Sequence, residues 1–144
     1  MSGLDSFLRG FGLFIGRLAV AFIFLFNAYG HITNFKGTLD YMASGVSYPE
    51  SVMRALLIIA IVLMVAGGLS MVLGLYTRFG AFCLLLFLLG VTPQMHGFWH
   101  GPADQMMMQL GQFTKNLAIF GGLLSYMAWG AGTWSIDTVR FAGK

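Results

Sequence analysis

Four apolar stretches separated by polar segments dominate the pattern of this chain. The clearest is 55–76 (ALLIIAIVLMVAGGLSMVLGLY), which contains no charged residue. A helix rises about 1.5 Å per residue, so this stretch is long enough to cross the ~30 Å hydrocarbon layer of a bilayer. The other apolar stretches cover about 11–30, 79–95 and 116–136. We therefore predict an all-α, integral membrane four-helix bundle formed by one domain, residues 1–144.

The composition supports a membrane protein. Hydrophobic residues make up 58% of the 144 positions and charged residues only 9%, which is far from the composition of a soluble domain. With four spans, this length leaves no room for a separate soluble catalytic domain. The net charge of +3 is explained by membrane orientation and requires no nucleic acid as a partner.

The distribution of basic residues predicts the orientation. An even number of spans places both termini on one side of the membrane, and the positive-inside rule then favours the side with more Lys and Arg. The side that carries the termini holds five of them, against three on the other side. We therefore predict that both termini are cytoplasmic and that the segments 31–54 and 96–115 face outward. The two sets are Arg9, Arg17, Arg78, Arg140 and Lys144 against Lys36, Arg54 and Lys115.

The outward segments hold all three histidines of the chain. His31 follows Arg17 by 14 residues and His96 follows Arg78 by 18, so on straight helices they lie about 21 and 27 Å away. Both therefore reach the outer boundary of the membrane. Asn27 and Gln94 shortly precede them, which predicts a half-buried polar pocket under the outer segments. The alternative is that these residues only anchor the helix ends at the interface.

The segment 94–109 suggests a metal site as an alternative. His96 and His100 are four residues apart, and Met95 with Met106, Met107 and Met108 would suit Cu(I). Gly97, Gly101 and Pro102 argue against a continuous helix there, so the main prediction includes no metal. Haem and copper are therefore not the expected cofactors, and both stay open as alternatives. Cys83 is the only cysteine, which excludes dithiol exchange within the chain.

The inner ends of the spans carry a candidate ion pair. Arg17 and Arg78 stand near the depth of Asp137, so we predict that one of the two arginines pairs with this carboxylate. Small residues also recur at helical spacing in the second span (Ala66, Ser70, Gly74) and the fourth (Gly121, Ser125). Such rows allow close helix contact in lipid, so we expect the second and fourth spans to form the packed centre.

The chain resembles the DoxX family of small four-span bacterial inner-membrane proteins over almost its whole length. The order and spacing of several short pieces carry this resemblance, which implies an inner-membrane location with cytoplasmic termini. The chain also departs from the family pattern: many members have a glutamate at the position of Met64 and often a lysine near that of His31. The pieces are Arg17-Leu18, 34–44, Gly67-Gly-Leu, 74–78, His96 with Phe98-Trp99, Lys115-Asn116, Gly121-Gly-Leu-Leu and 132–137.

The resemblance implies a redox role, because some family members are named as parts of quinone-linked oxidoreductase systems and others are associated with oxidative-stress complexes. More distant eukaryotic relatives resemble cargo receptors or assembly chaperones. Two main hypotheses follow. The first is that the protein is an accessory or quinone-interacting subunit of a membrane redox system. Its partner would then be a periplasmic or membrane redox protein. If it is an enzyme, it would be part of an oxidoreductase. The second is a non-enzymatic scaffold or chaperone for other membrane or exported proteins. Small-molecule or metal transport is a third hypothesis and would require a homodimer.

The first hypothesis assigns roles to specific residues. His31 and His96 would hydrogen-bond to a quinone head group, and Trp99 would stack on its ring or close the pocket. The candidate cofactor-binding residues are Asn27, His31, Gln94, His96, Trp99, Lys115 and Asn116.

Overall fold

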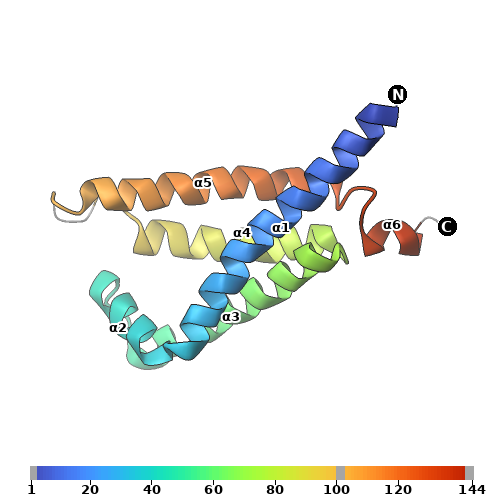
Figure 1. Ribbon diagram of the computed structural model, residues 1–144. Coiled ribbons are helices and arrows are strands. Elements are labelled where there is room, and N and C mark those ends of the chain that lie inside the picture. The colour runs from blue at the N-terminus through green and yellow to red at the C-terminus, as the bar shows by residue number, and fades with distance from the viewer. Residues whose placement is uncertain (1–2, 100–102, 142–144) are drawn as a thin grey trace.

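The computed structural model describes residues 3–99 and 103–141, and this part of the chain contains helices and no strand. Four helices are long: α1 (Gly3–Thr33), α3 (Glu50–Leu73), α4 (Thr77–Met95) and α5 (Met106–Trp129). Two are short: α2 (Phe35–Gly45) and α6 (Ile136–Phe141) (Figure 1). The prediction of an all-α fold is confirmed.

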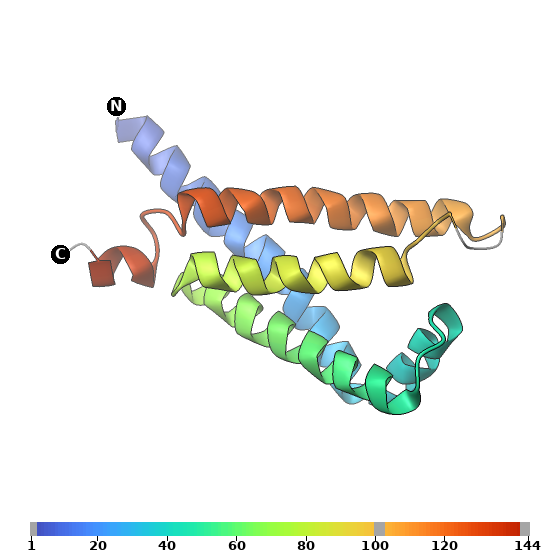
Figure 2. The same ribbon diagram turned by 180° about the vertical axis from the view of Figure 1, so that it is seen from behind.

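Three of these helices, α1, α3 and α4, are long and apolar enough to cross a membrane. The fourth, α5, has 24 residues like α3 and runs alongside α4 (Figures 1 and 2). Its first half is more polar because it carries Gln109, Gln112, Lys115 and Asn116. The predicted integral membrane helix bundle is therefore the fold of this chain.

The predicted span limits agree with the helices to different degrees. The stretch 79–95 matches α4 closely, and α1 extends beyond 11–30 at both ends. The stretch 116–136 was placed ten residues too late, because the helix begins at Met106 and ends where Gly130 and Gly132 adopt positive φ angles of 76° and 80°. Apolar content marks the part of a helix in lipid rather than the residues where the helix begins and ends.

Both termini lie at one end of the molecule, together with the turn between α3 and α4 (Figure 1). We call this the terminal end, and the opposite end, which carries α2 and the α4–α5 connection, the loop end. The cytoplasmic position of the termini stays a prediction.

The helices form two pairs that separate toward the loop end. α3 packs on α1, and α4 packs on α5. Near their turn, α3 and α4 come very close: a Cβ added to Gly67 would lie 2.9 Å from the carbonyl oxygen of Gly80. From there the two helices diverge (Figure 2). The result is a wedge-shaped space between the α1–α3 pair and the α4–α5 pair.

The prediction that the second and fourth spans form the packed centre is wrong. α3 makes its contacts with α1, α2 and α4, whereas α5 packs on α4. Gly121 and Gly122 of α5 face open space, since an added Cβ would meet no atom within 4 Å. The sequence shows which helices have small residues, but whether another helix packs closely against those residues depends on which helices are neighbours in the fold.

α2 closes the wedge at the loop end. Its first turn is capped by Asn34, whose side chain accepts a hydrogen bond from the Gly37 amide at 3.3 Å. Leu39 then packs on Met53 and Leu57 of α3. At the other end of α2, a Cβ on Gly45 would lie 3.3 Å from Cε of Met95 on α4. The predicted outer loop 31–54 is therefore largely helical, and α2 bridges the two helix pairs.

Candidate functional site

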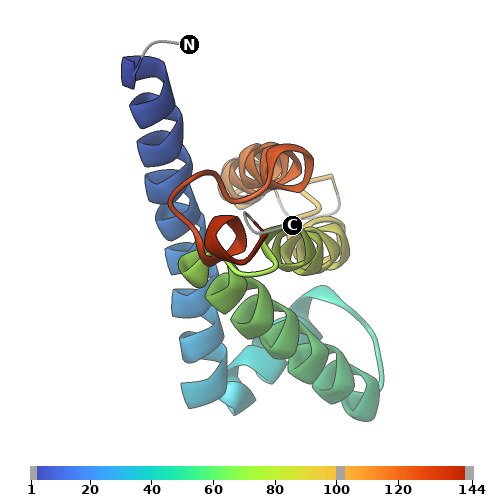
Figure 3. The same cartoon turned by 90° about the vertical axis from the view of Figure 1, so that its right-hand side faces the viewer.

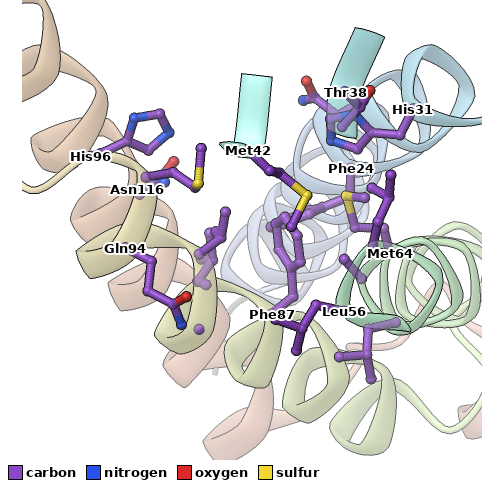
Figure 4. A pocket seen from close by; sticks show the side chains of 18 of the residues that line it. Phe24, His31, Thr38, Met42, Leu56, Met64, Phe87, Gln94, His96 and Asn116 are labelled. Atoms are coloured by element: carbon purple, nitrogen blue, oxygen red, sulfur yellow. The ribbon is translucent and has the colours of Figure 1, made fainter. Parts of the chain in front are cut away.

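A cavity of about 540 Å³ occupies the wedge near the loop end, below α2 (Figure 4). All four long helices contribute to its walls, and α2 supplies Thr38, Tyr41 and Met42. Such a volume lies within the range of small-molecule binding sites. We treat this cavity as the candidate functional site.

Six of the seven candidate residues line this one cavity, and they come from α1, α5 and the last turn of α4 with the residue that follows it. His31 and His96 stand on opposite sides of it in Figure 4. The structure therefore brings together residues that are up to 89 positions apart, from Asn27 to Asn116. Their role in binding a cofactor stays a prediction. The six are Asn27, His31, Gln94, His96, Lys115 and Asn116.

Trp99 is the candidate residue that does not line the cavity. Its ring packs edge-on against Phe98 and Phe113, with ring centroids 5.0 and 5.7 Å apart, and half of the residue is exposed. The chain bends after α4 ends at Met95, so Trp99 leaves the direction of that helix. A stacking role on a ligand inside the cavity therefore has no geometric support.

The hydrogen bonds of His31 determine which of its nitrogens can face a ligand. Nδ1 lies 3.3 Å from Oγ1 of Thr38, and that hydroxyl donates its own proton to the carbonyl oxygen of Asn34 at 3.0 Å. Since the hydroxyl has only one proton, Nδ1 must be the donor to Thr38. In the neutral imidazole Nε2 is then an acceptor.

His96 has the same arrangement. It follows the last residue of α4, and its Nδ1 lies 2.9 Å from Oε1 of Gln109 on α5. The Gln109 carboxamide presents its oxygen, which only accepts hydrogen bonds, so Nδ1 is the donor, and in the neutral imidazole Nε2 is again an acceptor. Both candidate histidines are thus held by a side chain of a neighbouring helix.

Several hydrogen-bond donors around the cavity are already used within the protein. Nδ2 of Asn116, which is buried, donates to Oγ1 of Thr92 at 3.1 Å. Nδ2 of Asn27 donates to the carbonyl oxygen of Ile23 at 2.6 Å, and Nζ of Lys115 donates to Gln112. Each of these bonds uses one proton of its donor, so the polar part of the cavity offers a ligand the two imidazole acceptors together with the remaining amide and ammonium protons.

The inner part of the cavity is apolar. Phe24 of α1 and Phe87 of α4 meet edge to face, with centroids 5.9 Å apart, and Met64 of α3 is fully buried beside them. The cavity thus has a polar end near α2 and an apolar end near the middle of the bundle. This distribution suits an amphiphilic ligand.

The cavity residues of α2 and Gln112 of α5 were not predicted from the sequence. The segment 31–54 was expected to be an outer loop, although Phe35, Leu39 and Met42 have the spacing of one helix face after the capping residue Asn34. That spacing was the available signal. Gln112 could have been found as the neighbour of Gln109 and Asn116 on one face of α5.

The metal alternative rested on His96 and His100. His100 lies outside the described residues, and within residues 3–99 and 103–141 no three His, Cys, Asp or Glu side chains form a group that could hold a metal ion.

At the terminal end, the predicted partners of Asp137 are replaced by others. Its carboxylate accepts hydrogen bonds from the backbone amides of Tyr76 (2.7 Å) and Thr77 (3.0 Å) at the start of α4. Arg17 donates instead to the carbonyl oxygens of Met71 and Trp134, and Arg78 to that of Ala128. Among the described residues, Glu50–Arg54 is the pair that makes a direct salt bridge.

Asp137 binds the start of α4 because the N-terminal end of a helix stabilises a negative charge. The first amides of α4 lack partners within the helix, and a carboxylate stabilises them. Tyr76, the residue before α4, makes no side-chain cap, so Asp137 from α6 supplies one across 60 positions of sequence. α6 lies over the ends of the long helices when they are viewed from the terminal end (Figure 3).

We expect Asp137→Asn to lower the free energy of unfolding by about 1–2 kcal/mol, because an amide replaces one of the two accepting oxygens. Equilibrium unfolding in mixed micelles measures it, and Asp40→Asn on the exposed face of α2 is the matched control. Energetic coupling between Asp137→Asn and Arg78→Met above about 0.5 kcal/mol would instead favour the ion pair.

The fold and the cavity define a small multi-span membrane protein with a potential ligand site between its helices. The chain belongs to the DoxX family, whose model matches residues 12–97. It is similar to the inner membrane protein YphA of Escherichia coli strain K12, with 34% identity over 125 residues and 87% of each chain covered. It is also 32% identical over 130 residues to the inner membrane protein YqjF of the same strain, covering 90% of this chain and 92% of the relative. No solved structure gives a significant match.

These relatives and the spanning helices confirm the predicted location. The chain is a multi-pass protein of the bacterial inner membrane. The lipid bilayer is therefore the surroundings of the cavity as well as of the helices.

Proposed function

We propose that this protein binds the head group of a membrane quinol or quinone in the loop-end cavity and serves a membrane redox system as an accessory subunit. The observation that supports this most directly is the pair of imidazole acceptors, Nε2 of His31 and Nε2 of His96, on the walls of one cavity. A quinol has two hydroxyl donors on opposite edges of a flat ring. Two acceptors facing one apolar space match that chemistry.

The remaining features of the cavity support the same ligand class. Phe24, Phe87 and Met64 provide an apolar surface for a ring, and Lys115 retains donor capacity toward a carbonyl oxygen because its ammonium has three protons. Nε2 of a neutral imidazole is a base, so each histidine is placed to accept a proton that a quinol loses on oxidation. The electrons would pass to a partner redox protein, which fits an accessory role.

Binding of a short-chain benzoquinol and its quinone to the purified protein in nanodiscs tests this proposal. We expect the quinol to bind more tightly, and His31→Phe and His96→Phe each to weaken quinol binding about tenfold through loss of one hydrogen bond. Calorimetric titration measures both constants. Trp99→Phe is the control, and we expect its affinity to stay within about twofold of the wild type.

Native mass spectrometry of the protein in its own lipids provides an independent check. Failure of both quinone forms to bind would refute the proposal. A stoichiometric protein partner without any quinone would then favour the scaffold or chaperone alternative.

A further inference from the structure

The cavity has a side that opens between α3 and α4. Leu56 and Ile59 of α3 and Leu86 and Gly90 of α4 line the cavity and are also exposed on the outside of the molecule. A residue that contacts both spaces marks a boundary between them. α3 and α4 diverge on this side (Figure 2), so the four residues frame an opening, which we call the α3–α4 opening.

The depth of this opening places it in lipid. Gly90 and Leu86 precede the end of α4 at Met95 by five and nine residues, which is about 7.5 and 13.5 Å. Leu56 and Ile59 follow the start of α3 at Glu50 by six and nine residues, about 9 and 13.5 Å. The opening therefore lies below the helix ends, within the span-length part of both helices, where acyl chains rather than water surround a protein.

The opposite side of the wedge has a different character. There, between α1 and α5, the exposed residues that line the cavity are Asn27 and Lys115. Polar and charged groups are costly against hydrocarbon. On α4 the exposed polar residue of the lining is Gln94, which lies one turn nearer the helix end than Gly90, and the four residues of the opening itself carry no polar side chain. The α3–α4 opening is therefore the side that suits an alkyl or isoprenoid chain.

The size of the cavity limits what it can enclose. A volume of about 540 Å³ is in the range that holds a drug-sized molecule and not a long lipid chain in addition. A ligand with a long tail must therefore leave part of that tail outside. The α3–α4 opening leads from the apolar end of the cavity, near Phe87 and Met64, to the bilayer.

We propose that the ligand is a long-chain amphiphile that enters laterally from the bilayer, with its head under α2 and its hydrocarbon tail in the α3–α4 opening. This proposal rests on the proposed function for the head group and adds the tail and the route of entry. Gly90 has a specific role: it leaves free space in the opening, since a Cβ added there would meet no atom within 4 Å.

The experiment uses the full chain in nanodiscs and a long-chain benzoquinol with a photoreactive diazirine on its tail. After illumination, peptide mapping identifies the labelled residues. We expect labels at Leu56, Ile59 and Leu86. We expect Gly90→Trp, which fills the opening, to reduce this labelling about tenfold. Gly121→Trp is the matched control because Gly121 is also an exposed helical glycine with open space around it, but on α5 and outside the cavity.

A tail-less benzoquinol separates failure of this inference from failure of the proposed function. We expect the tail-less compound to bind the wild type, because its head group uses the polar end of the cavity under α2 and not the opening. Labels at Ile23 and Ile119 on the α1–α5 side, or labelling unchanged by Gly90→Trp, would overturn the lateral route while binding of the tail-less compound persists. Absence of binding for both compounds would refute the proposed function itself.

Discussion

Arg17→Met is expected to lower the free energy of unfolding by about 2–4 kcal/mol, because two charge-assisted hydrogen bonds of about 1.5–3 kcal/mol each are lost. Part of this loss is offset, because the variant no longer has to bury a charged guanidinium. Arg17 is 1% exposed. One nitrogen donates to the carbonyl oxygen of Met71 at 2.9 Å, and another donates to that of Trp134. The side chain therefore joins α1, the last turn of α3 and the segment before α6.

The position of the guanidinium explains why a charge is tolerated there. The last carbonyl groups of a helix have no partners within it and carry a partial negative charge, so a cation at the end of α3 is stabilised. From the sequence, Arg17 was expected at the inner ends of the spans, as one of two candidate partners of Asp137. The structure shows that it bonds inside the protein, at the terminal end of the bundle.

Unfolding of the variants in mixed micelles measures the effect, with Arg78→Met as the matched control. Arg78 is exposed and donates a hydrogen bond of 3.2 Å to the carbonyl oxygen of Ala128, so its loss should cost no more than about 1 kcal/mol. Arg17→Lys should fall between wild type and Arg17→Met, because one ammonium replaces the planar fork that reaches two carbonyl groups. Equal effects of Arg17→Met and Arg78→Met would show that burial of Arg17 contributes nothing.

Most of the candidate site could be predicted from the depth of its residues in the membrane, counted along the helices. The rise of a helix is fixed, so counting 14 and 18 residues from the two arginines placed His31 and His96 at one level of the membrane. The structure puts both on one cavity. The same reasoning failed for Trp99, because proximity in sequence says nothing about direction once the helix has ended.

The cover of the cavity could not be predicted in the same way. α2 is too short and too polar to be recognised as a span, and its contacts with α3 and α4 are tertiary. Thr38 shows the consequence: its hydroxyl sets the tautomer of His31, yet in the sequence it is one threonine in a loop-like segment. The chemistry of the site depends on such partners as much as on the histidines.

The terminal end shows a different limit of sequence reasoning. Opposite charges at similar depth predict an ion pair, but backbone groups at helix ends compete for the same side chains. Asp137 accepts from the amides of Tyr76 and Thr77 at the start of α4, and Arg17 donates to a carbonyl oxygen of α3. Whether Arg17 and Asp137 bind each other or the backbone groups at the helix ends depends on the course of the backbone around the α3–α4 turn. This course depends on one glycine.

Gly74→Ala is expected to destabilise the protein by about 3 kcal/mol or more. Gly74 ends α3 in the left-handed conformation, at φ 62° and ψ 37°, where a residue with a Cβ pays about 1–2 kcal/mol. The added Cβ would also lie 2.6 Å from Cβ of Ser135 and 2.9 Å from Cζ of Arg17. The methyl group must therefore displace the guanidinium or the segment that leads to α6, and either movement weakens the bonds described above.

The free energy of unfolding again gives the test, with Gly121→Ala as the control. Gly121 lies within α5 and faces open space, so alanine should stabilise that helix by about 0.5–1 kcal/mol. Because the alanine at position 74 acts partly through Arg17, Gly74→Ala and Arg17→Met combined should cost less than the sum of the two single changes. Strict additivity would mean that the backbone conformation of Gly74 alone accounts for its effect, and that the contact with Arg17 does not hold the terminal end together.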